Sequence, residues 1–333
     1  MASLRIDMHS HYYGGALPDM LRARTGFPRL HRRADGQDAM VAMNGEFPFS
    51  PAYHDPAVGL AQMDDCGITH RMITFPGALG VDLLPVAAAP AISAFNAHLA
   101  DLGRSSAGRL IGLAGLPLAD SDLAVREVAH SRAMGLPGII LPGNYFLTEA
   151  AAAPLRPVLA EASRLGALVM IHPGLLVGQQ PPVLPQDHPQ YRISALDLQN
   201  QIAQTALTVI LSDMLDTYPG IRFQIVNLGG TLPFIFERLE SIARHRNPDA
   251  PFPSHRLRAL WYDCASLGPR ALEAAVALLG ADRIMLGSDY PIFKENPVAV
   301  VAAANLTPVQ RQQILGQTAA NLLAGLGVQG LVV

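Results

Sequence analysis

The sequence predicts a (β/α)8 barrel that forms one domain over residues 1–333. Short runs of apolar and β-branched residues alternate with longer segments rich in alanine and leucine, which is the pattern of strands and crossover helices in a parallel sheet. There are eight such runs, and eight parallel strands joined by helices close naturally into a barrel. The length fits this fold, because α/β barrels of this size still form one domain.

The predicted strands are spread along the whole chain, and the predicted helices lie between most of them. Each helical segment ends near a glycine, a proline or a polar turn, where helices commonly stop. The strands are expected at residues 4–9, 70–75, 110–116, 138–141, 168–172, 222–227, 260–264 and 283–287. The helices are expected at residues 86–104, 150–165, 199–218, 231–243 and 269–279.

Two segments between predicted elements are unusually long, at residues 12–56 and 173–198. Each follows the carboxyl end of a predicted strand, and the loops at that end of a barrel carry lids and substrate pockets. The second segment is rich in proline and glutamine. We therefore expect both segments to form walls of a functional site.

Composition excludes several classes of partner. The net charge is −3 and only 15% of the residues are charged, so no basic surface for nucleic acid or anionic membranes is expected. Apolar stretches such as residues 271–281 are much shorter than the roughly 20 residues that a membrane span needs. No signal-peptide pattern precedes the first strand. Cys66 and Cys264 are too few for a disulfide scaffold, which favours a cytoplasmic protein.

Polar side chains at the ends of three predicted strands indicate a metal site. His9 and His11 end the first strand, and their spacing of two residues places both imidazoles on one side of the backbone. His172 ends the fifth predicted strand, and Asp289 follows the eighth. One such histidine alone is more often buried for structural reasons, but four candidate ligands at the same end of a barrel favour a shared centre. We predict one divalent ion, zinc first, with manganese or another first-row metal as alternatives, and no organic cofactor.

These motifs resemble those of the amidohydrolase superfamily, in particular the branch that contains aminocarboxymuconate-semialdehyde decarboxylase and 6-methylsalicylate decarboxylase. The resemblance covers nearly the whole chain and implies that the four side chains above hold a catalytic metal. The branch includes decarboxylases, hydratases and hydrolases, so the resemblance specifies the metal-binding residues better than the reaction. The motifs that carry it are residues 6–11, 63–68, 172–173, 211–219, 228–233 and 287–291.

Asn227 departs from the pattern of this branch. Relatives usually carry a histidine before the Gly-Gly step that follows strand six, and this histidine exchanges a proton beside the metal; here the step is Asn227-Leu-Gly-Gly. An amide cannot exchange a proton near neutral pH. Asn227 therefore either orients a water or a substrate oxygen, or it caps the following helix. Asp289 is the best replacement for the proton-transferring group, ahead of His54 and His188 in the two long loops.

The arginines of the first long loop are candidate substrate ligands. A planar guanidinium matches the two oxygens of a carboxylate, so one of these side chains is expected to meet a small-molecule carboxylate substrate. The predicted substrate-binding residues are Arg24 and Arg29, with Arg32 and Arg33 as further candidates, together with His54 and His188.

Three functions remain open at this point. The resemblance favours a metal-dependent decarboxylase of a small carboxylated aromatic or unsaturated acid. Asn227 favours instead a hydrolase of a lactone, an amide or a C–C bond in which Asp289 is the base, and a non-catalytic metal-binding barrel is the third interpretation. We prefer the decarboxylase. A homodimer is also expected, since half of the residues are hydrophobic and members of this branch commonly form dimers.

Overall fold

The computed structural model describes residues 4–43, 45–77 and 80–331, and within them the predicted barrel is present. Eight strands form two parallel sheets, in the orders β1-β5-β6 and β11-β10-β9-β8-β7. Parallel bridges from Asp7 to Leu286 and from Ala114 to Ile139 join the two sheets at both edges, which closes the barrel. The strands are β1 Ile6–Asp7, β5 His70–Thr74, β6 Leu110–Leu113, β7 Gly138–Pro142, β8 Leu168–His172, β9 Arg222–Ile225, β10 Trp261–Asp263 and β11 Ile284–Met285.

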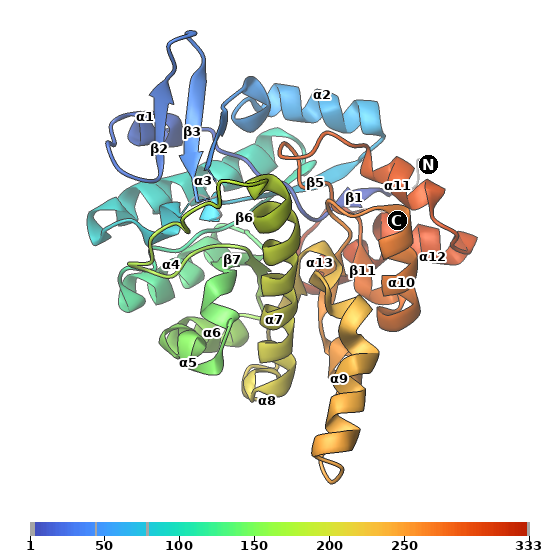
Figure 1. The fold of residues 1–333 in the computed structure, drawn as a ribbon. Helices are drawn as coiled ribbons and strands as arrows, with labels where there is room; N and C mark the ends of the chain where they lie inside the picture. Colours follow the sequence, from blue (N-terminus) through green and yellow to red (C-terminus); the bar gives the residue numbers. More distant parts are fainter. Residues whose placement is uncertain (1–3, 44, 78–79, 332–333) are drawn as a thin grey trace.

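Helices surround this barrel (Figure 1). The five predicted segments are helical, and α1, α2, α4, α11, α12 and α13 are additions to them. The predicted helix at 199–218 is interrupted at Ser212, whose backbone is extended, so that it forms α7 and α8. The main helices are α2 Pro56–Cys66, α3 Ala89–Ser105, α4 Ser121–Ala133, α6 Arg156–Arg164, α7 Leu198–Leu211, α9 Leu232–Arg246, α10 Pro269–Leu279 and α13 Thr318–Gly325. Shorter helices are α1 Leu17–Arg22, α5 Glu149–Ala152, α8 Met214–Thr217, α11 Pro297–Ala303 and α12 Pro308–Gln312.

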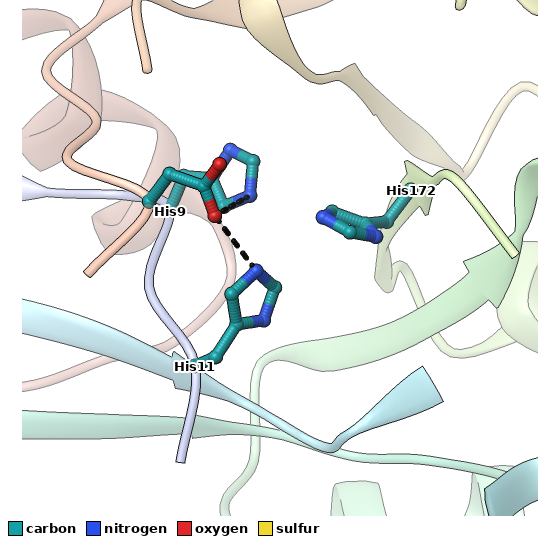
Figure 2. A group of neighbouring side chains, drawn as sticks. His9, His11 and His172 are labelled. Carbon is teal, nitrogen blue, oxygen red and sulfur yellow. Dashed lines mark hydrogen bonds and ion pairs between the residues drawn. The ribbon is translucent and has the colours of Figure 1, made fainter. Parts of the chain in front are cut away.

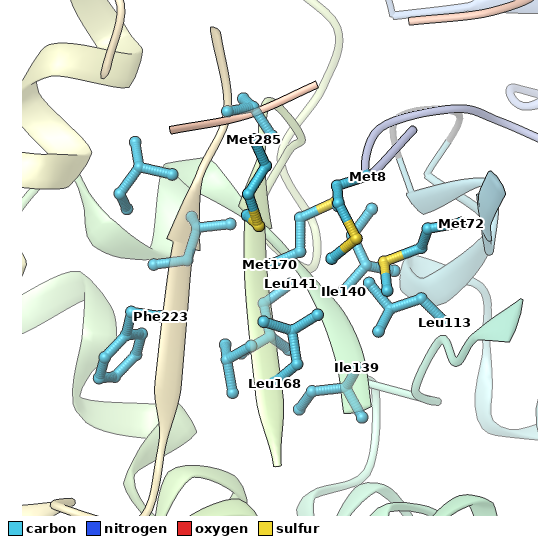
Figure 3. Close-up of a cluster of buried hydrophobic side chains, with 14 of the residues drawn as sticks. Met8, Met72, Leu113, Ile139, Ile140, Leu141, Leu168, Met170, Phe223 and Met285 are labelled. Carbon is cyan, nitrogen blue, oxygen red and sulfur yellow. The ribbon is translucent and has the colours of Figure 1, made fainter. Parts of the chain in front are cut away.

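The barrel interior is filled by buried apolar side chains from many strands. Figure 3 shows Met8, Met72, Met170 and Met285 meeting there, and all four are fully buried. Flexible thioethers fill the irregular space that rings and branched side chains leave between them. Since alternate residues of a strand share a face, Met170 in this core places His172 on the same inward face. The packed interior therefore forms the floor beneath the polar strand ends.

The segment 12–56 is more structured than the sequence indicated. It holds α1 and an antiparallel sheet of three strands, β2 Arg29–Arg32, β3 Asp38–Ala42 and β4 Gly45–Pro48. The β2 and β3 strands project from the barrel beside α2 (Figure 1). Segment 173–198 ends in a π-helical stretch, Gln190–Asp197, that runs into α7. Within the described ranges, no helix has the length and apolar character needed to cross a bilayer.

Candidate metal centre

Four side chains meet at the carboxyl ends of the barrel strands. His9 and His11 follow β1, His172 is the last residue of β8, and Asp289 follows β11. Their ligand atoms all lie within 4.8 Å of one another. Asp289 Oδ1 is 3.0 Å from His11 Nε2 and 3.7 Å from His9 Nε2. Figure 2 shows the three imidazole rings turned toward a common centre. The four residues that the sequence analysis grouped as metal ligands therefore lie close together in the structure.

Each imidazole of the cluster is oriented through its Nδ1 atom. Because Nδ1 is engaged by a neighbouring oxygen, Nε2 is the atom left to face the centre, which is the usual arrangement of metal-binding histidines. Among the described residues, the buried Nε2 of His9 has no hydrogen-bond partner, as expected of an atom reserved for a metal. The three Nδ1 contacts are His9 to Asp263 Oδ1 at 3.0 Å, His11 to Thr74 Oγ1 at 2.9 Å and His172 to the Pro173 carbonyl at 3.0 Å.

The charges of the cluster suit a cation. Burial and the neighbouring His11 and His9 hold the pKa of His172 well below its usual value, so this ring is neutral. Burial alone would raise the pKa of Asp289, but the His11 hydrogen bond and the adjacent imidazoles lower it. Burial alone would lower the pKa of His9, but Asp263 and Asp289 raise it to about 9. A neutral ring and an ionised carboxylate are the states that ligation needs, and a divalent cation would compete with the His9 proton.

The loop that carries Asp289 is held by a buried polar network. Asp7, which is fully buried, accepts hydrogen bonds from the backbone nitrogen of Ser288 at 3.0 Å and from its hydroxyl at 2.6 Å. The guanidinium of Arg71 pairs with the same carboxylate at 2.8 Å. Asp289 itself has a φ of 56°, a left-handed conformation that costs free energy unless its surroundings enforce it. Sequence reasoning missed this network, although a charged residue inside the apolar first strand was a usable signal.

Asn227 lies beside the cluster and does not cap a helix. It follows β9 with a left-handed φ of 53°, which Asn tolerates better than most residues, whereas α9 begins at Leu232. Its amide nitrogen donates to Ser266 Oγ at 3.0 Å, and its backbone nitrogen donates to Asp263 Oδ1 at 3.2 Å. Its buried Oδ1 has no partner among the described residues. This oxygen is therefore available to accept a hydrogen bond from a bound molecule.

The cluster opens into a cavity of about 260 Å³. His11, His172, Asp289 and Asn227 line one side of it, and apolar residues form most of the rest. Both long segments contribute to the lining. The apolar residues are Ala42, Met43 and Phe47 from segment 12–56, Pro173 and Leu198 from segment 173–198, and Ile292 and Phe293 from the loop after β11.

The arginines predicted to meet a substrate do not reach this cavity. The guanidinium of Arg24 donates to the carbonyls of Pro28 at 2.8 Å and Phe27 at 2.9 Å, within its own loop. Arg29 lies on β2 and is not among the lining residues. Arg32 pairs with the carboxylate of Asp38 and Arg33 with that of Glu46, so both guanidinium groups are already engaged within segment 12–56.

The two loop histidines also lie away from the cluster. The ring of His54 stacks on Phe49 with centroids 5.1 Å apart. His188 is exposed, has a left-handed φ of 54° and lies beside Tyr191. Neither residue lines the cavity. The local packing of these two loops, which the sequence does not reveal, separates them from the metal ligands.

Comparison with known proteins places this geometry in a family. A family model described as Amidohydrolase matches residues 6–324. The chain belongs to the amidohydrolase family. It is 26% identical to 2-amino-3-carboxymuconate-6-semialdehyde decarboxylase of Dictyostelium discoideum over 304 residues, which cover 87% of this chain and 82% of that protein.

Further relatives agree with this assignment. The chain is 24% identical to a 6-methylsalicylic acid decarboxylase of Aspergillus aculeatus over 310 residues, covering 86% of this chain and 84% of that protein. The crystal structure of IDCase from Metarhizium anisopliae in its apo form has the same fold, with a TM-score of 0.81 at 18% identity over 97% of each chain. The resemblance to the amidohydrolase superfamily and the barrel fold are both confirmed.

Proposed function

We propose that this chain is a metal-dependent, non-oxidative decarboxylase of a small aromatic or unsaturated carboxylic acid. The observation that carries the proposal is the cluster of three histidines and one aspartate at the base of a small, mainly apolar cavity. Two decarboxylases that match more than four fifths of the chain support this reaction class. A cavity of about 260 Å³ suits an acid with a single ring or a short conjugated chain.

His9, His11, His172 and Asp289 would hold one divalent ion, with zinc as the first candidate and manganese as the second. The oriented Nδ1 atoms and the unpartnered Nε2 of His9 fit such an ion. When bound, the ion supplies an electrophile for the oxygens of the substrate. No organic cofactor is needed, because the electrons of the broken bond return to the protonated carbon.

The chain's own residues must deliver one proton. Decarboxylation breaks the bond between the carboxylate and its carbon, releases carbon dioxide and replaces it with hydrogen, so each turnover consumes one proton. We assign the relay of this proton to Asp289, which lines the cavity: its ionised carboxylate would take a proton from solvent and pass it to the carbon that loses the carboxylate. Both oxygens of the other lining carboxylate, Glu46, are paired with Arg33 and His31. Asn227 Oδ1 would orient a water or a substrate group beside it.

A substrate panel tests the proposal. Metal-loaded protein is incubated with hydroxybenzoates, muconate-like acids, lactones and amides, and the products are followed by chromatography and carbon dioxide detection. We expect carbon dioxide from at least one planar acid without any added organic cofactor. Turnover confined to lactones or amides would replace the decarboxylase with a hydrolase in which Asp289 acts as the base.

We also propose a cytoplasmic homodimer. Both cysteines are free, which suits a reducing compartment. Large apolar side chains are exposed on the surface, among them Phe234 of α9 with 93% of its surface exposed, and a second copy could cover such residues. Light scattering at micromolar concentration should give twice the mass of one chain; the mass of a single chain would contradict the dimer.

A further inference from the structure

A carboxylate that enters the cavity meets no cationic side chain there. Among the described residues that line the cavity, none is an arginine or a lysine. Arg24, Arg32 and Arg33 of segment 12–56 are engaged by carbonyls and carboxylates of that segment. Arg29 does not line the cavity. Since an ionised carboxylate loses its hydration on entering an apolar cavity, it needs a hydrogen-bond donor from the protein as well as a metal.

Tyr13 lies at the right place to be that donor. It follows the ligand His11 by two residues, lines the cavity and is 1% exposed. Its ring is stacked with the imidazole of His11, with centroids 6.1 Å apart, and with the ring of Tyr53, with centroids 5.5 Å apart. Its backbone nitrogen donates to the Tyr53 carbonyl at 2.7 Å. The ring is therefore held by two neighbouring rings and through its backbone.

The hydroxyl of Tyr13 makes no hydrogen bond to another described residue, and it is not one of their fully buried, unpartnered polar atoms, so it is open to the cavity that Tyr13 lines. A tyrosine with a buried ring usually places this group on a protein acceptor or in a wet space. A phenol is protonated at neutral pH and therefore donates. The buried ring therefore holds an unpaired donor that is open to the cavity, where a bound molecule can supply the acceptor.

We propose that the hydroxyl of Tyr13 donates a hydrogen bond to the carboxylate of the substrate. This inference rests on the proposed decarboxylase function and names the group that recognises the acid in place of an arginine. A neutral donor next to apolar walls selects an acid with one carboxylate and an otherwise apolar body. A second carboxylate would find no cation among the described lining residues.

The variant Tyr13→Phe removes only this hydroxyl and keeps the stacked ring. Steady-state kinetics on the substrate identified by the panel should show KM raised on the order of tenfold to a hundredfold, the scale of one hydrogen bond to a charged group, with kcat within about threefold of wild type. The inhibition constant of benzoate, an unreactive carboxylate, should rise by the same factor. The inhibition constant of the decarboxylated product, which has no carboxylate, should stay within about twofold.

Tyr53→Phe is the matched control. It removes a hydroxyl from the next ring of the same stack, and Tyr53 does not line the cavity. All of these constants should be unchanged in this variant. Thermal unfolding gives a separate measurement, because loss of an unpaired hydroxyl should leave the midpoint of Tyr13→Phe unchanged or higher.

Three results would overturn the inference. The first is an unchanged KM and an unchanged benzoate constant in Tyr13→Phe. The second is an equal rise in the inhibition constants of benzoate and of the product, which would show that the hydroxyl contacts the ring of the bound molecule and not its carboxylate. The third is a lower unfolding midpoint, which would make the hydroxyl a structural group. If the wild type releases no carbon dioxide, the proposed function fails, but benzoate binding still tests Tyr13 independently.

Discussion

The two walls of the metal cavity are stabilised in different ways. On the barrel side, His9, His11 and His172 are each oriented by a hydrogen bond from Nδ1 to a neighbouring oxygen. Elsewhere in the lining, Met43 and Phe47 of segment 12–56 offer apolar surface, and Glu46 of the same segment is paired with Arg33 and His31. The charged side chains of that segment, such as Arg32 and Asp38, pair with one another. The comparison indicates that the barrel strands position the cluster of candidate ligands, whereas segment 12–56 shapes the space beside it and adds Tyr13 to the lining.

The largest expected effect comes from removing a ligand on the barrel side. His172→Ala should lose bound metal and lower turnover by roughly a thousandfold or more, since a metal electrophile contributes several kcal/mol to the transition state. The fold should remain, because this side chain is at the cavity surface. Elemental analysis and activity measure the two effects. His188→Ala, in the exposed loop, is the control and should behave as wild type. A metal-free wild type together with a fully active His172→Ala would contradict the metal site.

Asn227 should give the next largest effect. Asn227→Ala removes the unpaired Oδ1 and should lower turnover on the order of tenfold to a thousandfold, the scale seen when one preorganised hydrogen-bonding group is lost. Asn227→His restores the imidazole common among relatives and should preserve or raise decarboxylation. Unchanged turnover in Asn227→Ala would show that the side chain only packs against its neighbours and orients no reacting group. Steady-state kinetics on the substrate of the panel distinguish these outcomes.

A change behind the ligands should be smaller. Asp263 accepts hydrogen bonds from His9 Nδ1 and Gln224 Nε2, at 3.0 and 2.9 Å. Asp263→Asn keeps the shape of this group but removes its charge, so metal affinity should fall on the order of tenfold to a hundredfold. Competition with a chelator measures the affinity. Asp282→Asn, which alters a surface carboxylate, is the control. Equal affinity in both variants would show that the charge behind His9 is unimportant.

The clustering of the four candidate ligands at the strand ends could be predicted from the sequence, whereas the residues that support them could not. His9, His11, His172 and Asp289 end apolar runs whose order along the chain assigns them to one end of a barrel. Thr74 and Asp263 become partners only through the pairing of particular strands, which a single sequence does not reveal.

Segment 12–56 illustrates a different limit. Its strands carry charged residues on their outer face, so the alternation typical of a half-buried strand is weak. The partners of its arginines depend on the register of β2 against β3, which pairs Arg32 with Asp38. Two of the arginines that the sequence suggested as substrate ligands, Arg32 and Arg33, instead pair with carboxylates of this small sheet.

The smallest expected effect lies in that sheet. Arg22 and Arg32 lower the pKa of Asp38 from its ordinary value of 3.8. Because the folded state lowers this pKa, the stabilisation is present above the ordinary pKa and is lost as the pH falls through the lowered value. Asp38→Asn should cost at most about 0.5 kcal/mol at pH 7, as exposed pairs do, and almost nothing near pH 2. Urea unfolding at both pH values, with Asp249→Asn as control, measures it. An equal cost at both pH values would contradict this origin.

Isotope incorporation during turnover tests the decarboxylase account most directly. Metal-stripped and metal-reloaded protein are incubated in deuterium oxide with the acid identified by the panel, and carbon dioxide and product are measured together. We predict one carbon dioxide per product, one deuterium at the carbon that lost the carboxylate, and activity that disappears on stripping and returns with the metal. Reloaded protein that releases no carbon dioxide from any planar acid, while it hydrolyses a lactone or an amide, would contradict the account.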